Sequence, residues 1–502
     1  MQGVWTPDQI RAAEQRLFTR TPEPAVMRRA AFAVAVQTAQ VLTEQTGGVA
    51  GRRVVLLVGG GNNGGDALWA GAFLRRRGAA VTAVLLSPDK AHPAGLTALR
   101  RARGRIVEAT GASPDTAGIG AAAADAVEGA DAVVDGIVGL AARGPLRPVA
   151  AELVRRVTAP IVAVDLPSGV DPVTGAVEGA AVQAEVTVTF GGRKPCHVLG
   201  RAAVRSGDVQ LVDIGLDDDL GEPELRVLEA ADVGERWPVP RPEDDKYSQG
   251  VIGVAAGSAT YPGAAVLAAG AAVRTTSGMV RYAGPAADVV RAHWPEVIAT
   301  GSITDAGRVQ AWAVGPGIGT GSSGRDVMLH VLRSGHPVCA DADAITLLAK
   351  DPSLWDAREP DAPLVLTPHA GEFTRLSGDE LGIDRVGAAR EVAARYDAVV
   401  LLKGNTTVIA APDGRVLVND SHHAWPSTAG SGDVLTGMIG ALLASGVDAW
   451  EACGYASHVH SRAAALAARG TGGHGVGAPI GASALLAGVP EAIRTVRAAA
   501  LA

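Results

Sequence analysis

The stretch VVLLVGGGNNGGDAL, residues 54–68, decides the fold of the first half of the chain. It opens with an apolar, mostly β-branched run, Val54–Val58, which predicts a strand buried on both faces, because such a strand needs no polar alternation. Five glycines follow within seven residues, and Ala67–Arg77 then predicts a helix that Gly78 ends. A glycine-rich turn between a strand and a helix lets backbone N–H groups converge on an anionic ligand. The stretch therefore predicts a ligand-binding strand–turn–helix unit.

The predicted turn carries three polar side chains that its shape does not require: Asn62, Asn63 and Asp66. The alternative is that Asn and Asp only tolerate turn geometry. Amide and carboxylate groups placed beside converging backbone amides favour a binding role instead.

A second glycine-containing loop, STAGSGDVLTGMIGALL, lies at residues 427–443. Gly430 and Gly432 precede Asp433, and an apolar helix is predicted from Val434 to Leu443. Small residues let the helix N-terminus approach a phosphate, and Asp433 then lies where a general base would face that phosphate. The alternative is that Asp433 only favours the start of a helix.

Length and composition exclude several classes of protein. A chain of 502 residues predicts two domains, and a net charge of −7 argues against a nucleic-acid-binding protein. The 47% hydrophobic and 4% aromatic content, with 64 glycines, is typical of parallel α/β layers. Three cysteines without a CxxC pattern exclude a disulfide framework and a cysteine zinc site, and they suit the cytoplasm. We expect an amphipathic helix rather than a signal peptide in residues 1–20, and no membrane span.

Strand and helix patterns alternate through the first half, which predicts a doubly wound parallel sheet with helices on both faces, a Rossmann-like α/β domain. Its ligand site should lie beyond the carboxyl ends of the strands. Strands are predicted at Val54–Val58, Ala80–Leu86, Ala132–Val134, Ile161–Val164 and Val186–Phe190.

An acidic and proline-rich stretch, residues 213–246, predicts a linker with the domain boundary between Leu220 and Ala230. The second half is again α/β and ends in helices from Val434 to Ala499. We therefore predict two domains, residues 1–222 and 230–502. Elements of the second domain are predicted at Val251–Ala256, Ala264–Thr275 (a helix), Ala311–Val314, Val338–Cys339, Leu364–Leu366, Val399–Leu402 and Thr407–Ala410.

Polar residues follow several predicted strands of the first domain and should converge on one site. Asn63, Asp135 and Ser168 offer amide, carboxylate and hydroxyl oxygens, which suit a hard cation. Asp165 follows an apolar strand, where its carboxylate can give or take a proton. A lone Asp at a strand end is more often a cap, but four such strand ends together favour function.

With the segments DGIVGLAARGPL (135–146) and DLPSGVD (165–171), the first half resembles the NAD(P)H-hydrate epimerase domain. The resemblance implies that the hydrated nicotinamide dinucleotide and a potassium ion bind here, the ion through Asn63, Asp135 and Ser168. The chain has Ala67 where the family usually has Gly. The implied substrate residues are Asn62, Asn63, Gly64, Gly65, Asp66, Gly139, Leu140, Ala141, Ala142, Arg143, Gly144, Pro145 and Asp165, the last being catalytic.

The second half resembles the ADP-dependent NAD(P)H-hydrate dehydratase domain, which is ribokinase-like. The resemblance rests on GPGIG (315–319), TPHAGEF (367–373), KGNTTV (403–408) and AGSGD (429–433). It implies that Asp433 is catalytic and contacts the ring hydroxyl, and that Ala264, Gly317 and His369 hold the substrate. Taken alone, His369 is equally a packed core histidine. The implied nucleotide residues are Lys403, Gly404, Asn405, Thr406, Thr407 and Gly432.

Together the two halves resemble a bifunctional NAD(P)H-hydrate repair enzyme. The resemblance implies epimerisation of the R and S hydrates, and ADP-dependent dehydration of the S form to NAD(P)H, AMP and phosphate. The expected cofactors are potassium in the first domain and ADP with Mg²⁺ in the second. We expect a cytoplasmic homo-oligomer with no nucleic-acid or membrane partner.

Two alternatives remain at the level of sequence. In the first alternative, the second domain is a ribokinase-like kinase that phosphorylates a small molecule. The presence of KGNTTV beside TPHAGEF argues against this alternative. In the second alternative, the first domain is a non-catalytic binding module. The intact NNGGD segment, Asp135 and the DLPSG segment argue against it.

Overall fold

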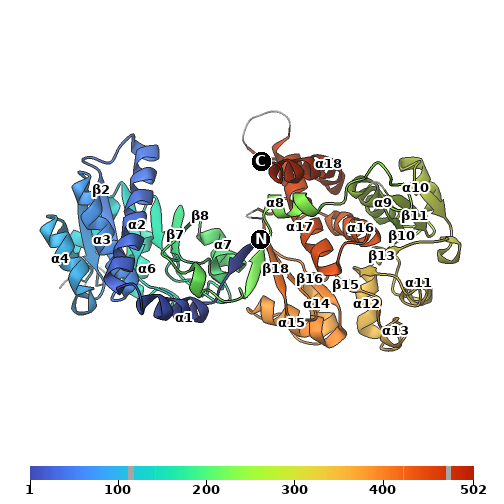
Figure 1. Ribbon diagram of the computed structural model, residues 1–502, viewed down its shortest axis with the longest axis horizontal. Helices are drawn as coiled ribbons and strands as arrows, with labels where there is room; N and C mark the ends of the chain where they lie inside the picture. The colour runs from blue at the N-terminus through green and yellow to red at the C-terminus, as the bar shows by residue number, and fades with distance from the viewer. Residues whose placement is uncertain (111–117, 142, 277, 422, 471–475) are drawn as a thin grey trace. The chain divides into compact units, whose positions relative to one another are not determined.

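The computed structural model describes residues 1–110, 118–141, 143–276, 278–421, 423–470 and 476–502 (Figure 1). The chain forms two compact units, one of Gly3–Leu225 and the other of Arg226–Ala502 with Met1–Gln2. The first two residues belong with the second unit because the Met1 amino group contacts Asp232 and the Gln2 side chain donates to Glu229. The predicted first domain had included them.

The described strands of the first unit form a seven-stranded parallel sheet in the order β4-β3-β2-β5-β6-β7-β8. Chain order reverses between β2 and β5, which is where ligands bind in doubly wound sheets. The strands are β2 (Arg53–Val58), β3 (Ala80–Leu85), β4 (Arg105–Glu108), β5 (Ala132–Gly136), β6 (Ile161–Val164), β7 (Val186–Phe190) and β8 (Asp208–Val212). The helices are α1 (Pro7–Phe18), α2 (Glu23–Thr46), α3 (Asn62–Arg76), α4 (Pro93–Arg101), α5 (Ala121–Glu128), α6 (Pro148–Arg155) and α7 (Gly200–Arg205).

The apolar run of β2 faces two hydrophobic cores at once. Val54, Leu56 and Val58 join the core under α2 and α3, and Val55 and Leu57 join the core under α5 and α6. Both faces of the strand are buried, so the expectation of a doubly covered parallel sheet is confirmed.

The glycine-rich segment after β2 is a helix start rather than a turn, because α3 begins at Asn62 and not at Ala67. None of its five glycines has a left-handed backbone, and two of them, Gly59 and Gly64, are needed for close approach to other backbone atoms. A Cβ on Gly59 would lie 1.8 Å from the Ile137 carbonyl oxygen, and one on Gly64 would lie 2.4 Å from the Gly59 carbonyl oxygen. The first turn of α3 can therefore lie directly against the ends of β2 and β5.

The second unit contains a larger sheet, whose described strands have the order β1-β9-β18-β17-β16-β15-β14-β13-β10-β11-β12. β17 runs antiparallel to its neighbours β16 and β18. The strands are β1 (Gln2–Val4), β9 (Leu225–Val227), β10 (Val251–Ala255), β11 (Met279–Ala283), β12 (Ile298–Thr300), β13 (Ala311–Val314), β14 (Val338–Ala340), β15 (Leu364–Leu366), β16 (Val399–Leu402), β17 (Thr406–Ala410) and β18 (Val416–Asp420). The helices are α8 (Ala230–Arg236), α9 (Gly263–Thr275), α10 (Ala287–His293), α11 (Ser322–Leu332), α12 (Asp343–Lys350), α13 (Ser353–Asp356), α14 (Ala370–Ser377), α15 (Arg385–Tyr396), α16 (Ser431–Ala444), α17 (Ala449–Arg469) and α18 (Ala482–Ala499).

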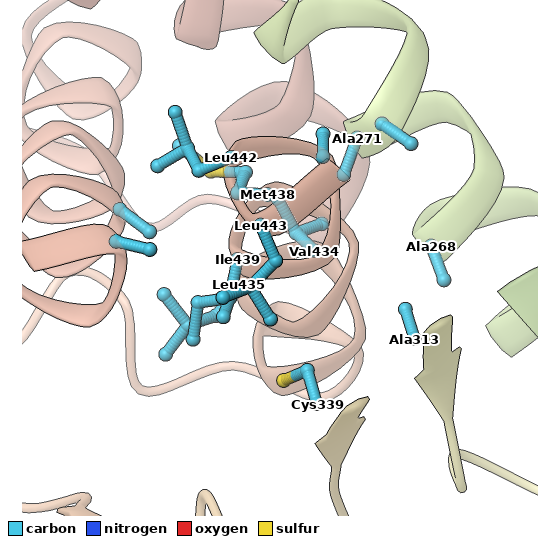
Figure 2. Close-up of a cluster of buried hydrophobic side chains, with 14 of the residues drawn as sticks. Ala268, Ala271, Ala313, Cys339, Val434, Leu435, Met438, Ile439, Leu442 and Leu443 are labelled. Atoms are coloured by element: carbon cyan, nitrogen blue, oxygen red, sulfur yellow. The ribbon is translucent and has the colours of Figure 1, made fainter. Parts of the chain in front are cut away.

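Helix α16 is buried at the centre of this unit, as Figure 2 shows. Its apolar side chains belong to one buried cluster with Ala268 and Ala271 of α9 and Ala313 of β13. A Cβ on Gly437 would lie 2.2 Å from the Ala268 carbonyl oxygen, so glycine allows the two helices to touch. The packing fixes the N-terminus of α16, which carries Asp433, relative to the sheet.

Several elements differ from their predicted form. The predicted linker contains β9 and α8; β9 pairs with β18, and Val233 of α8 is buried in the core. Residues 1–20 contain β1 before α1, which is shorter than predicted because Thr6 caps its start. α16 begins three residues earlier than predicted. None of the helices in the described part of the chain is long and apolar enough to cross a membrane.

Candidate active sites

A cavity of about 290 Å³ lies at the carboxyl edge of the first sheet. It contains seven of the residues predicted for the substrate site, and helices α1 and α2 supply further side chains. The lining residues are Arg11, Glu14, Phe18, Glu23, Val26, Met27, Ala30, Gly61, Asn62, Asn63, Asp66, Gly139, Leu140, Ala141, Asp165, Phe190, Lys194 and Ile214.

Asp165 enters this cavity directly after β6 and forms a buried ion pair. Lys194 Nζ donates to its Oδ1 over 2.5 Å, and the Thr189 hydroxyl donates to the same oxygen over 3.0 Å. Lys194 also donates to Thr189 Oγ1 and to the Phe190 carbonyl, so three acceptors hold its ammonium group. Lys194 and Thr189 therefore fix the carboxylate of Asp165 at the cavity wall.

The backbone of Asp165 is held in the left-handed region, with φ of 68°, which is costly for a residue with a Cβ. His197 stabilises it: its Nδ1 accepts from the Lys194 N–H over 3.0 Å, so Nε2 carries the hydrogen that is donated to the Asp165 carbonyl over 2.8 Å. Burial lowers the pKa of His197 to about 4, which keeps this imidazole neutral.

Three more carboxyl groups line the same cavity, those of Glu14, Glu23 and Asp66, and burial affects the first and last of them. Burial, followed by the charges of Asp165 and Glu14, raises the pKa of Asp66 well above its ordinary value. The Oδ1 of Asp66 is closed to solvent and has no hydrogen-bond partner among the described residues. Burial and the charge of Asp165 also raise the pKa of Glu14 on α1.

The predicted cation ligands are linked by hydrogen bonds: Asn63, which lines the cavity, and Ser168 both contact the Val138 backbone, and Ser168 contacts Asp135. Asp135, which is inside β5 rather than after it, accepts hydrogen bonds from Ser168 Oγ (2.7 Å), Ser168 N (2.8 Å) and Ile137 N (3.2 Å). Asn63 Nδ2 donates to the carbonyls of Val138 and Val164. Burial raises the pKa of Asp135 to about 6. Its carboxylate has no cationic partner within ion-pair distance in the described part of the chain.

The remaining predicted residues of the first site lie outside the cavity lining. Gly64 packs against the Gly59 carbonyl and Gly65 against the His92 side chain, and Arg143 contacts Asp171 and the Leu140 carbonyl. Gly144 and Pro145 do not reach it, and Ala142 lies outside the described residues. Ala67 is buried against Gly136 and does not line the cavity.

The second unit contains a cavity of about 640 Å³ over the N-terminus of α16. Most of the predicted nucleotide residues line it, together with His369 and Asp433. The lining residues are Asp341, Ala342, His369, Lys403, Gly404, Asn405, Thr407, Asn419, Ser421, His423, Ala424, Pro426, Ser427, Thr428, Ser431, Gly432, Asp433, Leu435, Ser457, His460 and Ser461.

Asp433 faces this cavity from the first turn of α16. Burial, and then the negative charge of Asp341, raise its pKa to about 6, against the opposing charge of Lys403. Its carboxylate makes no hydrogen bond with another described residue, and the N-cap of the helix is Gly430 instead. A free carboxylate with this pKa can accept a proton near neutral pH.

Asp341 links the lysine of the KGNTTV motif to α16. Its Oδ1 accepts from Lys403 Nζ over 2.7 Å and its Oδ2 accepts from the Thr436 hydroxyl over 2.8 Å. Burial lowers the pKa of Lys403, but the carboxylates of Asp341 and Glu372 raise it overall. The ammonium charge is therefore held beside Asp433, with Gly432 between the two elements.

His369 caps α14, since its Nδ1 accepts from the N–H groups of Gly371 and Glu372. Its ring is more than half exposed, so it is not a packed core histidine. Gly317 and Ala264 lie against each other but do not line the described cavity. Thr406 is buried in β17 and also lies outside the lining.

Sequence reasoning missed four residues that the fold brings to these cavities. Lys194 and Glu14 join Asp165 in the first, and Asp341 and His460 join Asp433 in the second. Lys194 and Asp341 do carry a signal, because each follows a buried strand, as the predicted residues do. Glu14 and His460 carry none, because each lies inside a helix.

These features define a two-domain α/β chain with a separate cavity in each domain, one lined by Asp165 and the other by Asp433. The family model described as NAD(P)H-hydrate dehydratase matches residues 252–479, and that described as YjeF-related protein N-terminus matches residues 24–196. The chain belongs to the family of bifunctional NAD(P)H-hydrate repair enzymes, as its similarity to curated members shows.

Similarity to these members extends through both domains. The bifunctional NAD(P)H-hydrate repair enzyme of Mycobacterium tuberculosis is 53% identical over 455 residues, which cover 90% of this chain and 91% of that protein. The Mycobacterium leprae enzyme is 52% identical over 475 residues, covering 94% and 95%. A solved structure, the ADP/ATP-dependent NAD(P)H-hydrate dehydratase of Bacillus subtilis co-crystallised with ATP/Mg²⁺, is 29% identical with a TM-score of 0.48. It covers 54% of this chain and 99% of its own.

Proposed function

We propose that the chain repairs hydrated nicotinamide cofactors in two steps. The first domain interconverts the R and S hydrates of NADH and NADPH. The second domain dehydrates the S form with ADP, giving NAD(P)H, AMP and phosphate. The observation that carries this proposal is the pair of cavities, each with a buried or half-buried carboxylate at its wall, in a chain of this family.

In the first domain, Asp165 is the proposed proton-transfer residue, and Asn62, Asn63 and Asp66 bind the substrate. The ion pair with Lys194 supports this assignment, because it fixes the carboxylate without using all of its lone pairs. His197 acts on the backbone only, since its ring nitrogens are both engaged by main-chain groups.

In the second domain, Asp433 is the proposed base for the ring hydroxyl. Hydroxide leaves poorly, so the hydroxyl oxygen first takes a phosphoryl group from ADP and then departs with it as phosphate. Lys403 and the backbone of Gly404–Thr407 hold the nucleotide phosphates. The described residues contain no cluster of three His, Cys, Asp or Glu side chains for a metal, so Mg²⁺ would be bound mainly through those phosphates.

The test supplies the purified S hydrate with ADP and analyses every product. Our proposal expects equal amounts of reduced cofactor, AMP and phosphate. A stable phosphorylated hydrate without reduced cofactor would instead assign the second domain to the small-molecule kinases.

The pKa of Asp433 makes the dehydration rate depend on pH. Because a base must be ionised, kcat/KM should rise about tenfold per pH unit below pH 6 and become constant above it. Asp341→Asn removes a negative charge that raises this pKa, so its rising limb should move to lower pH. Thr436→Val, which breaks a hydrogen bond to Asp341 without changing charge, is the control and should keep the limb near pH 6. If the rising part of the pH profile stays at the same pH in Asp341→Asn, the assignment of Asp433 as the base would be contradicted.

We further propose that potassium binds the first domain through Asn63, Asp135 and Ser168. The donor set fits, because Asp135 is fully buried and its described partners are all neutral hydrogen-bond donors. A bound potassium ion would supply the balancing charge and hold together the loops that carry these residues.

Potassium should therefore stabilise the first domain. Ligand present at about a hundred times its Kd adds about 2.7 kcal/mol of stability, which is on the order of 5–10 °C for a domain of this size. We expect this rise in the unfolding midpoint with potassium but not lithium, and its loss in Asp135→Asn. Equal midpoints in both salts would contradict a potassium site.

Two further expectations follow from the sequence and belong to this proposal. A cytoplasmic location suits the three free cysteines, all of which are buried. The oligomeric state that we expect is a homo-oligomer. Gel filtration with light scattering measures the oligomeric state directly.

A further inference from the structure

Helix α1 contributes to the first cavity through a face that the described motifs do not include. Ile10, Ala13 and Leu17 on one side of α1 are buried in the core. Arg11, Glu14 and Phe18, on the adjacent side, line the cavity at helical spacing. The whole helix lies before residue 24, where the match to the family model begins.

Glu14 is the acidic group that α1 brings to this cavity. Its carboxylate makes no hydrogen bond or ion pair with another described residue, and it is close enough to Asp165 for their charges to interact. The neighbouring Arg11 is engaged elsewhere, by Asp8 and by the Leu140 carbonyl. Glu14 is therefore free to contact a ligand in the cavity.

We propose that Glu14 is a second catalytic residue of the first domain and forms an acid–base pair with Asp165; this rests on the proposed epimerase activity. The hydrated carbon of the substrate is bonded to both a hydroxyl group and the ring nitrogen. Inverting that carbon by loss and re-addition of water needs one group to protonate the departing hydroxyl and another to deprotonate the incoming water. Glu14 and Asp165 reach the cavity from separate elements, α1 and the end of β6, so one can act as the acid while the other acts as the base.

The chemical steps balance without any further reagent. Glu14 gives its proton to the hydroxyl oxygen, the carbon–oxygen bond breaks, and water leaves while the nitrogen lone pair forms a carbon–nitrogen double bond. A water molecule then adds to the opposite face, the electron pair returns to nitrogen, and Asp165 takes the proton from the new oxygen. One interconversion leaves Glu14 ionised and Asp165 protonated. The two groups then exchange roles in the reverse interconversion, or they regain their starting states by exchanging protons with solvent water.

The other charged groups facing this cavity suit this assignment less well. Asp66 has an oxygen shut off from solvent, so it is poorly placed to exchange protons repeatedly. Glu23 is exposed. Lys194 and Arg11 are cations held by the partners described above, and they lower the pKa of Glu14, against the larger effects of burial and Asp165.

The experiment measures interconversion of the purified R and S hydrates by chromatography, in the full-length chain and without ADP. Rates are corrected for interconversion in the absence of enzyme. We expect Glu14→Gln to lower kcat by about a hundred- to ten-thousand-fold with KM changed only a few-fold. Glu14→Asp, which keeps a carboxylate, should have a kcat between those of the wild type and Glu14→Gln. Glu44→Gln, an exposed change on α2, is the matched control and should behave as wild type.

Two readouts separate catalysis from folding and from the proposed function. Glu14→Gln should still dehydrate the S hydrate with ADP, and the wild type in ¹⁸O-labelled water should introduce label at the rate of interconversion. A Glu14→Gln kcat within threefold of wild type, a loss confined to KM, or interconversion without label would overturn the acid–base pair. A wild-type chain that does not interconvert the hydrates would overturn the proposed epimerase activity itself.

Discussion

Asp433→Asn is expected to remove ADP-dependent recovery of the reduced cofactor while ADP still binds. Losing a positioned general base typically costs about a hundred- to ten-thousand-fold in rate. The loop should keep its shape, because Gly430 caps α16 with its left-handed backbone and the Asp433 carboxylate makes no hydrogen bond to another described residue. ADP affinity should be unchanged or slightly higher, since a negative charge near the phosphates is removed.

The measurement pairs ADP affinity by calorimetry with turnover of the S hydrate. Asp448→Asn is the matched control, because Asp448 is a true helix cap that accepts from the N–H groups of Trp450 and Glu451. It should leave turnover within a few-fold of wild type. Turnover at that level in Asp433→Asn would show that its carboxylate is not the base, and the kinase-like mechanism would be wrong.

Asp165→Asn should abolish interconversion of the hydrates and leave dehydration of the S form intact. An amide of the same size cannot exchange a proton, so a loss of about a hundred- to ten-thousand-fold is expected. The two units are separately compact, and the second site should not respond. Chromatography of the epimers measures the first activity, and cofactor absorbance measures the second.

This variant needs a control for folding, because it leaves the buried ammonium of Lys194 without its ion partner. Breaking a buried pair in this way costs about 3–5 kcal/mol. The double variant Asp165→Asn/Lys194→Gln replaces the pair with two neutral amides and should recover much of that stability but none of the interconversion. Recovered interconversion in the double variant would make Asp165 a structural residue.

The two-domain α/β fold was predictable because the strands are continuous buried apolar runs. Ile161–Val164 and Leu364–Leu366 have the bounds that the sequence predicts. β18 escaped prediction although its first three residues, Val416–Val418, are apolar, because the run is short and ends in Asn419 and Asp420. The predicted start of α3, at Ala67, was wrong for a different reason. Helix propensity disfavours glycine, whereas the close packing of the first turn of α3 requires glycine at Gly64.

The motif residues were predictable where they follow a strand or begin a helix, and their roles remain predictions. Their partners were not, because folding brings them from distant positions. Lys194 lies 29 residues from Asp165 and Lys403 lies 62 residues from Asp341, so neither ion pair has a local pattern. Glu14 depends on how α1 packs over the sheet, which no motif records.

The central claim is that one chain holds two independent activities that act in sequence on one damaged cofactor. The most direct measurement gives a mixture of R and S hydrates and excess ADP to the wild type, Asp165→Asn and Asp433→Asn, and follows the absorbance of the reduced cofactor to completion. The account predicts full recovery by the wild type, recovery of only the S fraction above the uncatalysed background by Asp165→Asn, and none by Asp433→Asn. Equal recovery by Asp165→Asn and the wild type, at equal rates, would contradict it.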